Sequence, residues 1–182
     1  MLRHQGTQVL NTSRLTLRPF ATSDAQAMFS NWASDPEVTR FLTWPTHTSL
    51  EISQWVCSDW ATHYEEKDYY QWAIVYDAMP IGSIAVVDKR DQVGRATIGY
   101  CIGRKWWGMG LTAEALRTVM DYLFDEVGYQ RIDAYHDPRN PNSGRVMRKC
   151  GMQYEGTLRQ SDWNNQGVCD ACWYALLKQD RT

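Results

Sequence analysis

The chain has 182 residues, of which 43% are hydrophobic and 22% are charged, and its formal net charge is −2. These values are typical of a globular chain large enough to bury a core, so we expect one domain spanning residues 1–182. The slight negative charge argues against nucleic-acid binding through overall charge, and we expect no direct nucleic-acid partner. No apolar run reaches the roughly 18 residues of a membrane span, and the first residues lack the apolar core of a signal peptide. We therefore expect a cytoplasmic protein without membrane contact.

The first hundred residues predict a strand, two helices and three further strands. In chain order they lie at residues 15–18 (strand), 23–33 and 49–66 (helices), and 71–76, 81–88 and 95–102 (strands), with a loop at 35–48. The second helix carries its predicted apolar stripe on Ile52, Trp55, Val56 and Trp60. The last three strands are joined by short turns, which predict antiparallel hairpins.

The pattern then changes to a long helix, a strand, a short helix and a hairpin. These elements are predicted at residues 110–127, 131–136 and 142–150, and at 153–158 with 170–177. The long helix has an apolar stripe and ends at Gly128, which suits the left-handed position after a helix. A strand, a crossover helix and a strand of this length form a βαβ unit, so residues 95–102 and 131–136 should be parallel. The expected fold is α+β, with a mixed and mostly antiparallel sheet.

The five cysteines predict neither a disulfide framework nor a metal site. Cys169 and Cys172 lie three positions apart on a predicted strand, where their side chains point to opposite faces. No second cysteine pair or histidine pair lies nearby in sequence, and zinc needs about four such ligands. We interpret the cysteines as structural thiols and expect no metal.

The turn before the long helix is the most informative segment of the chain. It crosses a basic and aromatic stretch and reaches Gly108 and Gly110 just before the helix begins. Backbone N–H groups and the positive end of the helix dipole converge there, an arrangement that binds phosphate. Glycines let a bulky anion approach the main chain closely. The sequence therefore predicts an anion site at this turn.

Several motifs in the same order resemble the GNAT N-acetyltransferases. Residues 107–116 resemble motif A of that family, whose phosphate loop follows Gln/Arg-x-x-Gly-x-Gly/Ala, and here Lys105 takes the first position. Further similarity lies in residues 14–18, 98–100, 140–143, 149–156 and 170–176. The resemblance covers nearly the whole chain and is closest to the RimJ/RimL-type branch, whose members acetylate N-terminal amines of ribosomal proteins. It implies helices on both faces of the sheet and a central parallel pair splayed for the cofactor.

The resemblance also implies acetyl-CoA as cosubstrate. Its pyrophosphate would bind the main-chain N–H groups of residues 107–112, and its pantetheine arm would lie between the two parallel strands. Strands that part leave unpaired backbone groups, which the amides of the arm can satisfy. By their positions in the family motifs, the implied cofactor-binding residues are Cys101, Ile102, Lys105, Trp107, Gly108, Met109, Gly110, Leu111, Thr112 and Asn140.

Acetyl transfer requires a proton to leave the amine and a proton to reach the departing thiolate. Many relatives use a tyrosine as the acid, but the matching position holds Met147, and in the RimJ/RimL branch a serine matching Ser143 is proposed instead. Ser143 is equally suited to cap the first turn of its helix. Thr97 stands where relatives often carry a glutamate and cannot be the base. His136, Asp137 or a water held by backbone carbonyls is left for that role.

We expect an acetyl-CoA-dependent N-acetyltransferase whose acceptor is the N-terminal α-amine of a protein, first of all a ribosomal protein. A small amine, such as a polyamine or an antibiotic, is the alternative acceptor. Glu37 and Arg40 are either acceptor contacts or solvated loop charges. A homodimer is compatible with the sequence.

Two other classes of protein stay open. One is a non-catalytic acyl-CoA binder, suggested by Met147 and Thr97 at positions where relatives keep catalytic groups. The other is a dinucleotide-binding protein, since residues 108–113 also satisfy Gly-x-Gly-x-x-Ala. Against the second, antiparallel hairpins precede the motif, and too few residues follow it for the second half of a doubly wound sheet.

Overall fold

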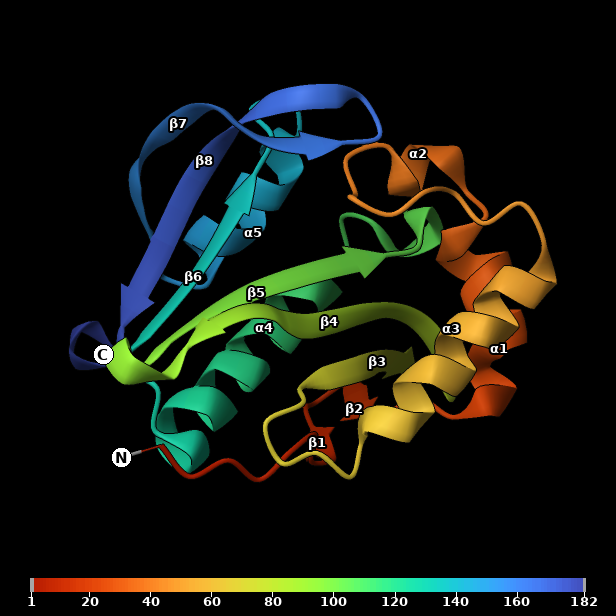
Figure 1. Ribbon diagram of the computed structural model, residues 1–182, viewed down its shortest axis with the longest axis horizontal. Coiled ribbons are helices and arrows are strands. Elements are labelled where there is room, and N and C mark those ends of the chain that lie inside the picture. The colour runs from red at the N-terminus through yellow and green to blue at the C-terminus, as the bar shows by residue number, and fades with distance from the viewer. Residues whose placement is uncertain (1, 182) are drawn as a thin grey trace.

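A computed structural model describes residues 2–181 (Figure 1). Its centre is one eight-stranded sheet in the order β1-β2-β3-β4-β5-β6-β8-β7. The strands are β1 (Leu10–Asn11), β2 (Leu15–Arg18), β3 (Gln71–Tyr76), β4 (Met79–Arg90), β5 (Arg95–Ile102), β6 (Arg131–His136), β7 (Gln153–Asn164) and β8 (Gly167–Leu177). All neighbouring strands are antiparallel except β5 and β6. The predicted mixed sheet with one parallel pair is confirmed.

Four of the five helices follow the predicted order, and α2 (Pro36–Thr39) was not predicted. They are α1 (Ala25–Met28), α2 (Pro36–Thr39), α3 (Leu50–His63), α4 (Leu111–Tyr122) and α5 (Pro141–Lys149). π-helical turns extend α1 through Phe29–Ala33 and α4 through Leu123–Val127, and Gly128 then takes the predicted left-handed conformation at φ 97°. In the part of the chain that the structure covers, no helix is long and apolar enough to cross a membrane.

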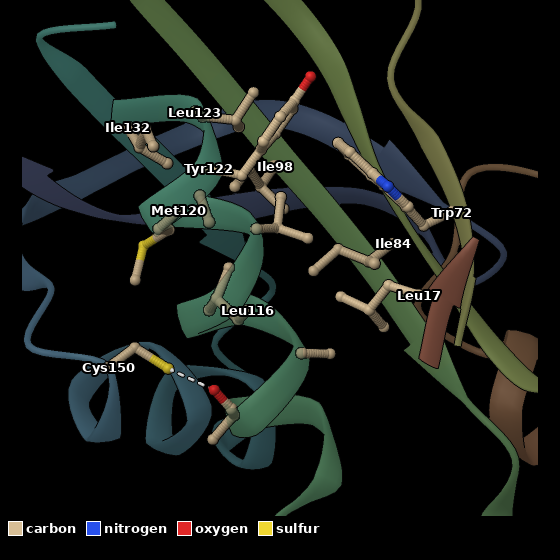
Figure 2. Close-up of a cluster of buried hydrophobic side chains, with 14 of the residues drawn as sticks. Leu17, Trp72, Ile84, Ile98, Leu116, Met120, Tyr122, Leu123, Ile132 and Cys150 are labelled. Carbon is tan, nitrogen blue, oxygen red and sulfur yellow. Dashed lines mark hydrogen bonds between the residues drawn. The ribbon is translucent and has the colours of Figure 1, made fainter. Parts of the chain in front are cut away.

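The alternation of side chains along the strands places one hydrophobic cluster on each face of the sheet. On one face, residues of β2 to β6 pack against the apolar stripe of α4 and against α5, where the Cys150 thiol donates to the Ala113 carbonyl at 3.3 Å (Figure 2). On the other face, Ala73, Val75 and Cys101 pack against α1 and α3. Helices on both faces are therefore confirmed.

Three local predictions were wrong. The segment predicted as a loop contains α2, where the Asp35 side chain accepts a hydrogen bond from the Glu37 N–H at 3.0 Å and so begins the helix. The apolar stripe assigned to α3 is also displaced, because Trp55 is 68% exposed while Ser53 and Cys57 face the core. The last hairpin is longer than predicted, and its strands run to Asn164 and from Gly167.

The parallel pairing of β5 and β6 is short. It joins only Arg95 to Arg131, Ala96 to Ile132 and Thr97 to Asp133. Beyond Thr97, β5 keeps its antiparallel partner β4, and beyond Asp133, β6 keeps β8. The two strands therefore part toward their C-terminal ends, as the family resemblance implied.

A buried carboxylate lies where the strands begin to part. Asp133 is 1% exposed and accepts hydrogen bonds from Thr97 Oγ1 at 2.7 Å, Arg95 Nε at 2.7 Å and Arg131 Nε at 3.1 Å. Thr97 and Arg95 belong to β5, whereas Asp133 and Arg131 belong to β6. The carboxylate thus ties the two strands together at the base of the opening.

We expect Asp133→Ala to lower the free energy of unfolding by about 3 kcal/mol, because it leaves buried donors without their acceptor. Asp88→Ala is the matched control. It removes a 58% exposed carboxylate that lies 3.5 Å from Nη1 of the same Arg95, and we expect a loss below about 1 kcal/mol. Urea unfolding of both variants measures the difference. Equal losses would contradict the role of Asp133.

Candidate active site

A cleft of about 470 Å³ opens where β5 and β6 part. Three walls surround it. The first is formed by the end of β5, the glycine turn and the start of α4, the second by residues 139–149 around α5, and the third by residues 37–42 in and after α2. The residues that line it from the predicted set are Cys101, Ile102, Trp107, Gly108, Gly110, Thr112, Asn140 and Ser143.

The glycine turn has the geometry of an anion site. Gly108 and Gly110 both have φ of 78°, in the left-handed region that strains residues with a side chain. Gly110 is the N-cap of α4, so the N–H groups of the first helical turn have no acceptor within the helix, and the positive end of the helix dipole lies at this turn. Gly110, Thr112 and Ala113 line the cleft. The Trp107 N–H, by contrast, donates to the Arg104 carbonyl at 3.1 Å. The free donors therefore begin at Gly108, one residue later than predicted.

The remaining predicted loop residues lie outside the cleft lining. Lys105 is exposed, and its Nζ lies 5.4 Å from the centre of the Trp106 ring. Leu111 is 1% exposed, so its side chain belongs to the core and only its backbone is near the turn. The Met109 carbonyl accepts from Arg14 Nη1 at 3.0 Å, and Arg14 also pairs with Glu114 at 2.6 Å. Arg14 therefore braces the glycine turn, a role that no local pattern around it indicated.

α5 contributes two positive side chains to the cleft lining. Arg145 and Lys149 both line the cleft. Glycines without side chains, free helical N–H groups and two nearby cations fit the diphosphate of acetyl-CoA. The parted strand edges fit its amide-bearing arm. The structure thus fits the cofactor that the sequence implied.

Trp107 also contributes to the cleft through its indole. Its Nε1 donates to the Ile102 carbonyl at 2.9 Å, and the residue is 46% exposed. The ring thus bonds back to the end of β5 and forms part of the wall. Cys101, next to it on the strand, is buried with its Sγ 3.5 Å from Ser83 Oγ. Burial raises the pKa of the Cys101 thiol, so it stays protonated near neutral pH.

Ser143 and Tyr100 both line the cleft and contact each other. The Ser143 Oγ is 3.1 Å from Tyr100 Oη, and Tyr100 Oη also donates to the Ser143 carbonyl at 3.1 Å. The N-cap residue of α5 is Asn140, and no side chain caps the helix. Ser143 is therefore not the side-chain cap that its position in the sequence also allowed. Met147 is 1% exposed and belongs to the core.

Tyr100 is a site residue that the sequence analysis did not single out, as are Arg139, Arg145 and Lys149. Tyr100 lies on the same face of β5 as Ile98 and Ile102, which is the face that α5 covers. Strand alternation was the signal that could have placed it opposite α5. Burial raises the pKa of Tyr100 well above its usual value, and the hydrogen bond with Ser143 only partly opposes this. Tyr100 is therefore a neutral phenol throughout the physiological pH range.

The side chains considered as bases lie outside the cleft lining. The His136 Nδ1 lies 2.8 Å from the Asp137 carbonyl, and its ring lies beneath Gly144, where an added Cβ would approach Nε2 to 2.5 Å. Burial by itself would raise the pKa of Asp137, but hydrogen bonds from Arg139 and Asn164 outweigh it and hold the pKa far below its usual value. Neither His136 nor Asp137 lines the cleft.

The two C-terminal cysteines lie apart from the cleft. Cys169 is buried beside Asn164, and Cys172 lies beside Thr157. Burial raises the pKa of Cys169 to about 11, with Asp137 and Asp162 adding to the effect. Within residues 2–181, no group of three or more His, Cys, Asp and Glu side chains has the arrangement of a metal site.

Comparisons with known proteins agree with this geometry. The family model of the acetyltransferase (GNAT) domain matches residues 14–153. A Bacillus subtilis (strain 168) protein named as the uncharacterized N-acetyltransferase YoaA is 33% identical over 172 residues, which are 93% of this chain and 97% of that protein. The ribosomal protein uS5-alanine N-acetyltransferase of Escherichia coli (strain K12) is 39% identical over 59 residues, 32% of this chain and 30% of that protein.

Solved structures show the same fold. RimL, described as a ribosomal L7/L12 alpha-N-protein acetyltransferase in complex with coenzyme A, superimposes with a TM-score of 0.85 at 19% identity, over 96% of this chain and 100% of that chain. An acetyltransferase (GNAT family) from Bacillus anthracis superimposes with a TM-score of 0.82 at 22% identity, over 94% of this chain and 99% of that chain.

The chain belongs to the GNAT acetyltransferase family. It is an N-acetyltransferase that uses acetyl-CoA as cosubstrate. The expected enzyme class is confirmed, and the non-catalytic and dinucleotide-binding alternatives are set aside. The sheet order, with one parallel pair, also differs from a doubly wound dinucleotide fold.

We expect Gly110→Val to raise the Kd for acetyl-CoA at least tenfold, because a branched side chain distorts the turn and covers its N–H groups. Gly151→Val is the matched control. Its φ of 81° imposes the same backbone strain, of about 1–3 kcal/mol, at a glycine outside the cleft. Titration calorimetry with acetyl-CoA compares the two. Equal affinity in both variants would remove the glycine turn from the cofactor site.

Proposed function

We propose that this protein acetylates the N-terminal α-amine of a protein, with ribosomal proteins as the favoured class. The observation that carries the proposal is the charge of the cleft. Among the described residues that line it, Glu37 is the one acidic side chain, and it faces four basic ones: Arg40, Arg139, Arg145 and Lys149. The acceptor therefore has to be compatible with a largely positive site.

The charge balance disfavours polycationic acceptors. We assign Arg145 and Lys149 to the cofactor phosphates, and Arg139 is paired with Asp137 at 2.6 Å. Arg40 has no carboxylate within ion-pair distance in the described chain, and its guanidinium lies 5.3 Å from the Phe41 ring centre. The single acidic side chain, Glu37, can pair with one ammonium group of the acceptor. A polyamine or an aminoglycoside brings several further positive charges, which the basic side chains repel.

An α-amine also needs little help to lose its proton. Its pKa is about 8, so about a tenth of it is neutral at pH 7, whereas a lysine amine with a pKa of about 10.4 is neutral in fewer than about one in a thousand molecules. This difference suits a cleft that neither His136 nor Asp137 lines. A water held by backbone carbonyls then suffices to accept the proton.

When bound, acetyl-CoA supplies an acetyl thioester. We assign Ser143 as the group that donates a proton to the departing sulfur, and Tyr100 as the residue that orients the Ser143 hydroxyl. Their 3.1 Å contact and the neutral state of Tyr100 support this assignment, because a phenol that donates to Ser143 Oγ leaves the serine proton free for the sulfur. Glu37 attracts the acceptor ammonium to the third wall of the cleft.

The names of relatives support the same class of acceptor. The Escherichia coli relative is a ribosomal protein uS5-alanine N-acetyltransferase, and the structural neighbour RimL is described as acting on ribosomal L7/L12. We also propose a cytoplasmic location, in keeping with the five free cysteines.

A release assay for the CoA thiol tests the acceptor. Peptides with the N-terminal sequences of ribosomal proteins should give the highest kcat/KM, at least tenfold above polyamines and aminoglycosides. With such a peptide, kcat/KM should rise about tenfold per pH unit below about pH 8 and then level off, as the free α-amine does. A polyamine or an aminoglycoside as the best acceptor would overturn the proposal.

We expect Ser143→Ala to lower kcat about a hundredfold while the Kd for acetyl-CoA stays within twofold, because only proton transfer to sulfur is lost. Tyr100→Phe keeps the ring but removes the contact with Ser143, so we expect a smaller loss of about tenfold. Since Tyr100 stays protonated, its removal should not shift the pH profile. Near-normal turnover of Ser143→Ala would exclude Ser143 as the acid.

A further inference from the structure

The tip of the β7–β8 hairpin contacts the third wall of the cleft, residues 37–42, which we call the acceptor wall. Figure 1 shows the hairpin extending to the segment that follows α2. There, Asn165 makes three hydrogen bonds to that segment. Its Nδ2 donates to the carbonyls of Thr39 and Trp44, both at 2.8 Å, and its backbone N–H donates to the Leu42 carbonyl at 3.1 Å.

The Thr39 and Trp44 carbonyls flank the cleft-lining residues of the acceptor wall, and the Leu42 carbonyl lies between them. Arg40, Phe41 and Leu42 lie between Thr39 and Trp44 and line the cleft. The segment after α2 contains no helix or strand before α3, and a hydrogen bond from the Leu42 N–H to the Thr39 carbonyl at 2.8 Å is its own internal turn. A contact between Thr39 Oγ1 and Thr46 Oγ1 at 2.6 Å also joins the two ends of the segment. Contacts from elsewhere in the chain add to these local bonds.

The amide of an asparagine suits this pattern at position 165. An asparagine Nδ2 carries two N–H donors, and both are used on two different carbonyls. Aspartate has no donor there when it is ionised, and its charge would face two carbonyl oxygens. The side chain of Asn165 thus holds the two ends of one short segment at a fixed separation.

The same hairpin tip is also hydrogen-bonded to the loop that leads into the second wall of the cleft, residues 139–149. Asn164, which is 4% exposed, donates from Nδ2 to Asp137 Oδ2 at 2.9 Å. Asp137 also accepts from the Arg139 backbone N–H at 2.8 Å and from its guanidinium. Arg139 and the adjacent Asn140 line the cleft on the side of α5. Two consecutive asparagines therefore connect the second wall of the cleft to the third.

We infer that Asn165 is a positioning residue for the acceptor. It sets the conformation of residues 40–42 and hence the shape of the acceptor wall, while Asn164 sets the distance of that wall from the loop before α5. The inference rests on the proposed acetylation of an amine bound against residues 37–42. It assigns acceptor selectivity to a hairpin tip that lies outside the cofactor motifs.

The kinetic test compares Asn165→Ala and Asn165→Asp with the control Gln166→Ala. The Gln166 side chain is exposed and donates only to the Asn165 carbonyl, at 3.2 Å. Both Asn165 variants should raise KM for the best acceptor of the release assay at least tenfold, with the Kd for acetyl-CoA within twofold of the original. Gln166→Ala should change neither. An unchanged acceptor KM, or an equal loss of acetyl-CoA affinity, would overturn the inference, because a merely structural role does not separate the two ligands.

A second readout needs no acceptor. Trypsin cleaves after Arg40 when the segment between Thr39 and Trp44 is released, and mass spectrometry identifies the cut. Cleavage there should be at least tenfold faster in Asn165→Ala than in the original protein or in Gln166→Ala. Equal rates would overturn the inference. If a small amine proves to be the best acceptor, the proposed protein substrate fails, whereas the role of Asn165 is still decided by that amine's KM and by the cleavage rate.

Discussion

The early end of the β5–β6 pairing is the constraint on which the site depends. Beyond Thr97 and Asp133 each strand keeps only its antiparallel neighbour, so the facing backbone edges are left for an extended, amide-bearing ligand. The crossover helix that connects the same two strands begins just after β5, which brings the N-terminus of α4 to the open end. A single interruption of a strand ladder therefore produces a groove and places an anion site beside its mouth.

Asp133 shows how the base of that opening is held. A carboxylate that is 1% exposed costs desolvation free energy, and hydrogen bonds from both strands offset this cost. Well-packed apolar side chains would fill the same space without a desolvation cost, but they would form no hydrogen bonds between particular residues of the two strands. The benefit of the carboxylate is therefore the direction of its hydrogen bonds. It fixes which residues of β5 and β6 lie side by side where the strands begin to part, and Thr97 is used for this purpose rather than for chemistry.

Local patterns predicted much of the fold because its signals are local. Strand alternation and short turns were sufficient for β3, β5 and β6, and the apolar stripe together with Gly128 was sufficient for α4. The glycine turn belongs to the same category, since left-handed backbone and a helix start are properties of a few consecutive residues. The prediction of the buried stripe on α3 failed because apolar residues occur on all sides of that helix, and packing against α1 decides which of them are buried. Trp55 is consequently exposed.

The site was predicted only where its parts are contiguous. Lys105 has the right place in a motif, yet its ammonium lies over Trp106, and cations from α5 take the positions beside the cleft. Tyr100 meets Ser143 across 43 positions of sequence, and no pattern near either residue reports that contact. Sequence motifs indicate the groups that fit the cofactor common to the family, whereas contacts between residues far apart in sequence shape the rest of the cleft.

This difference has a consequence for how acceptors are chosen in this fold. The part of the cleft that fits the cofactor consists largely of main-chain N–H groups and strand edges, which most substitutions leave in place. The acceptor wall is a segment without regular structure whose three carbonyls are held by one asparagine from a distant hairpin. A change of residue at the hairpin tip can reshape that wall without touching the glycine turn. Relatives can therefore share the reaction and differ in acceptor, because the two halves of the cleft are built from different parts of the chain.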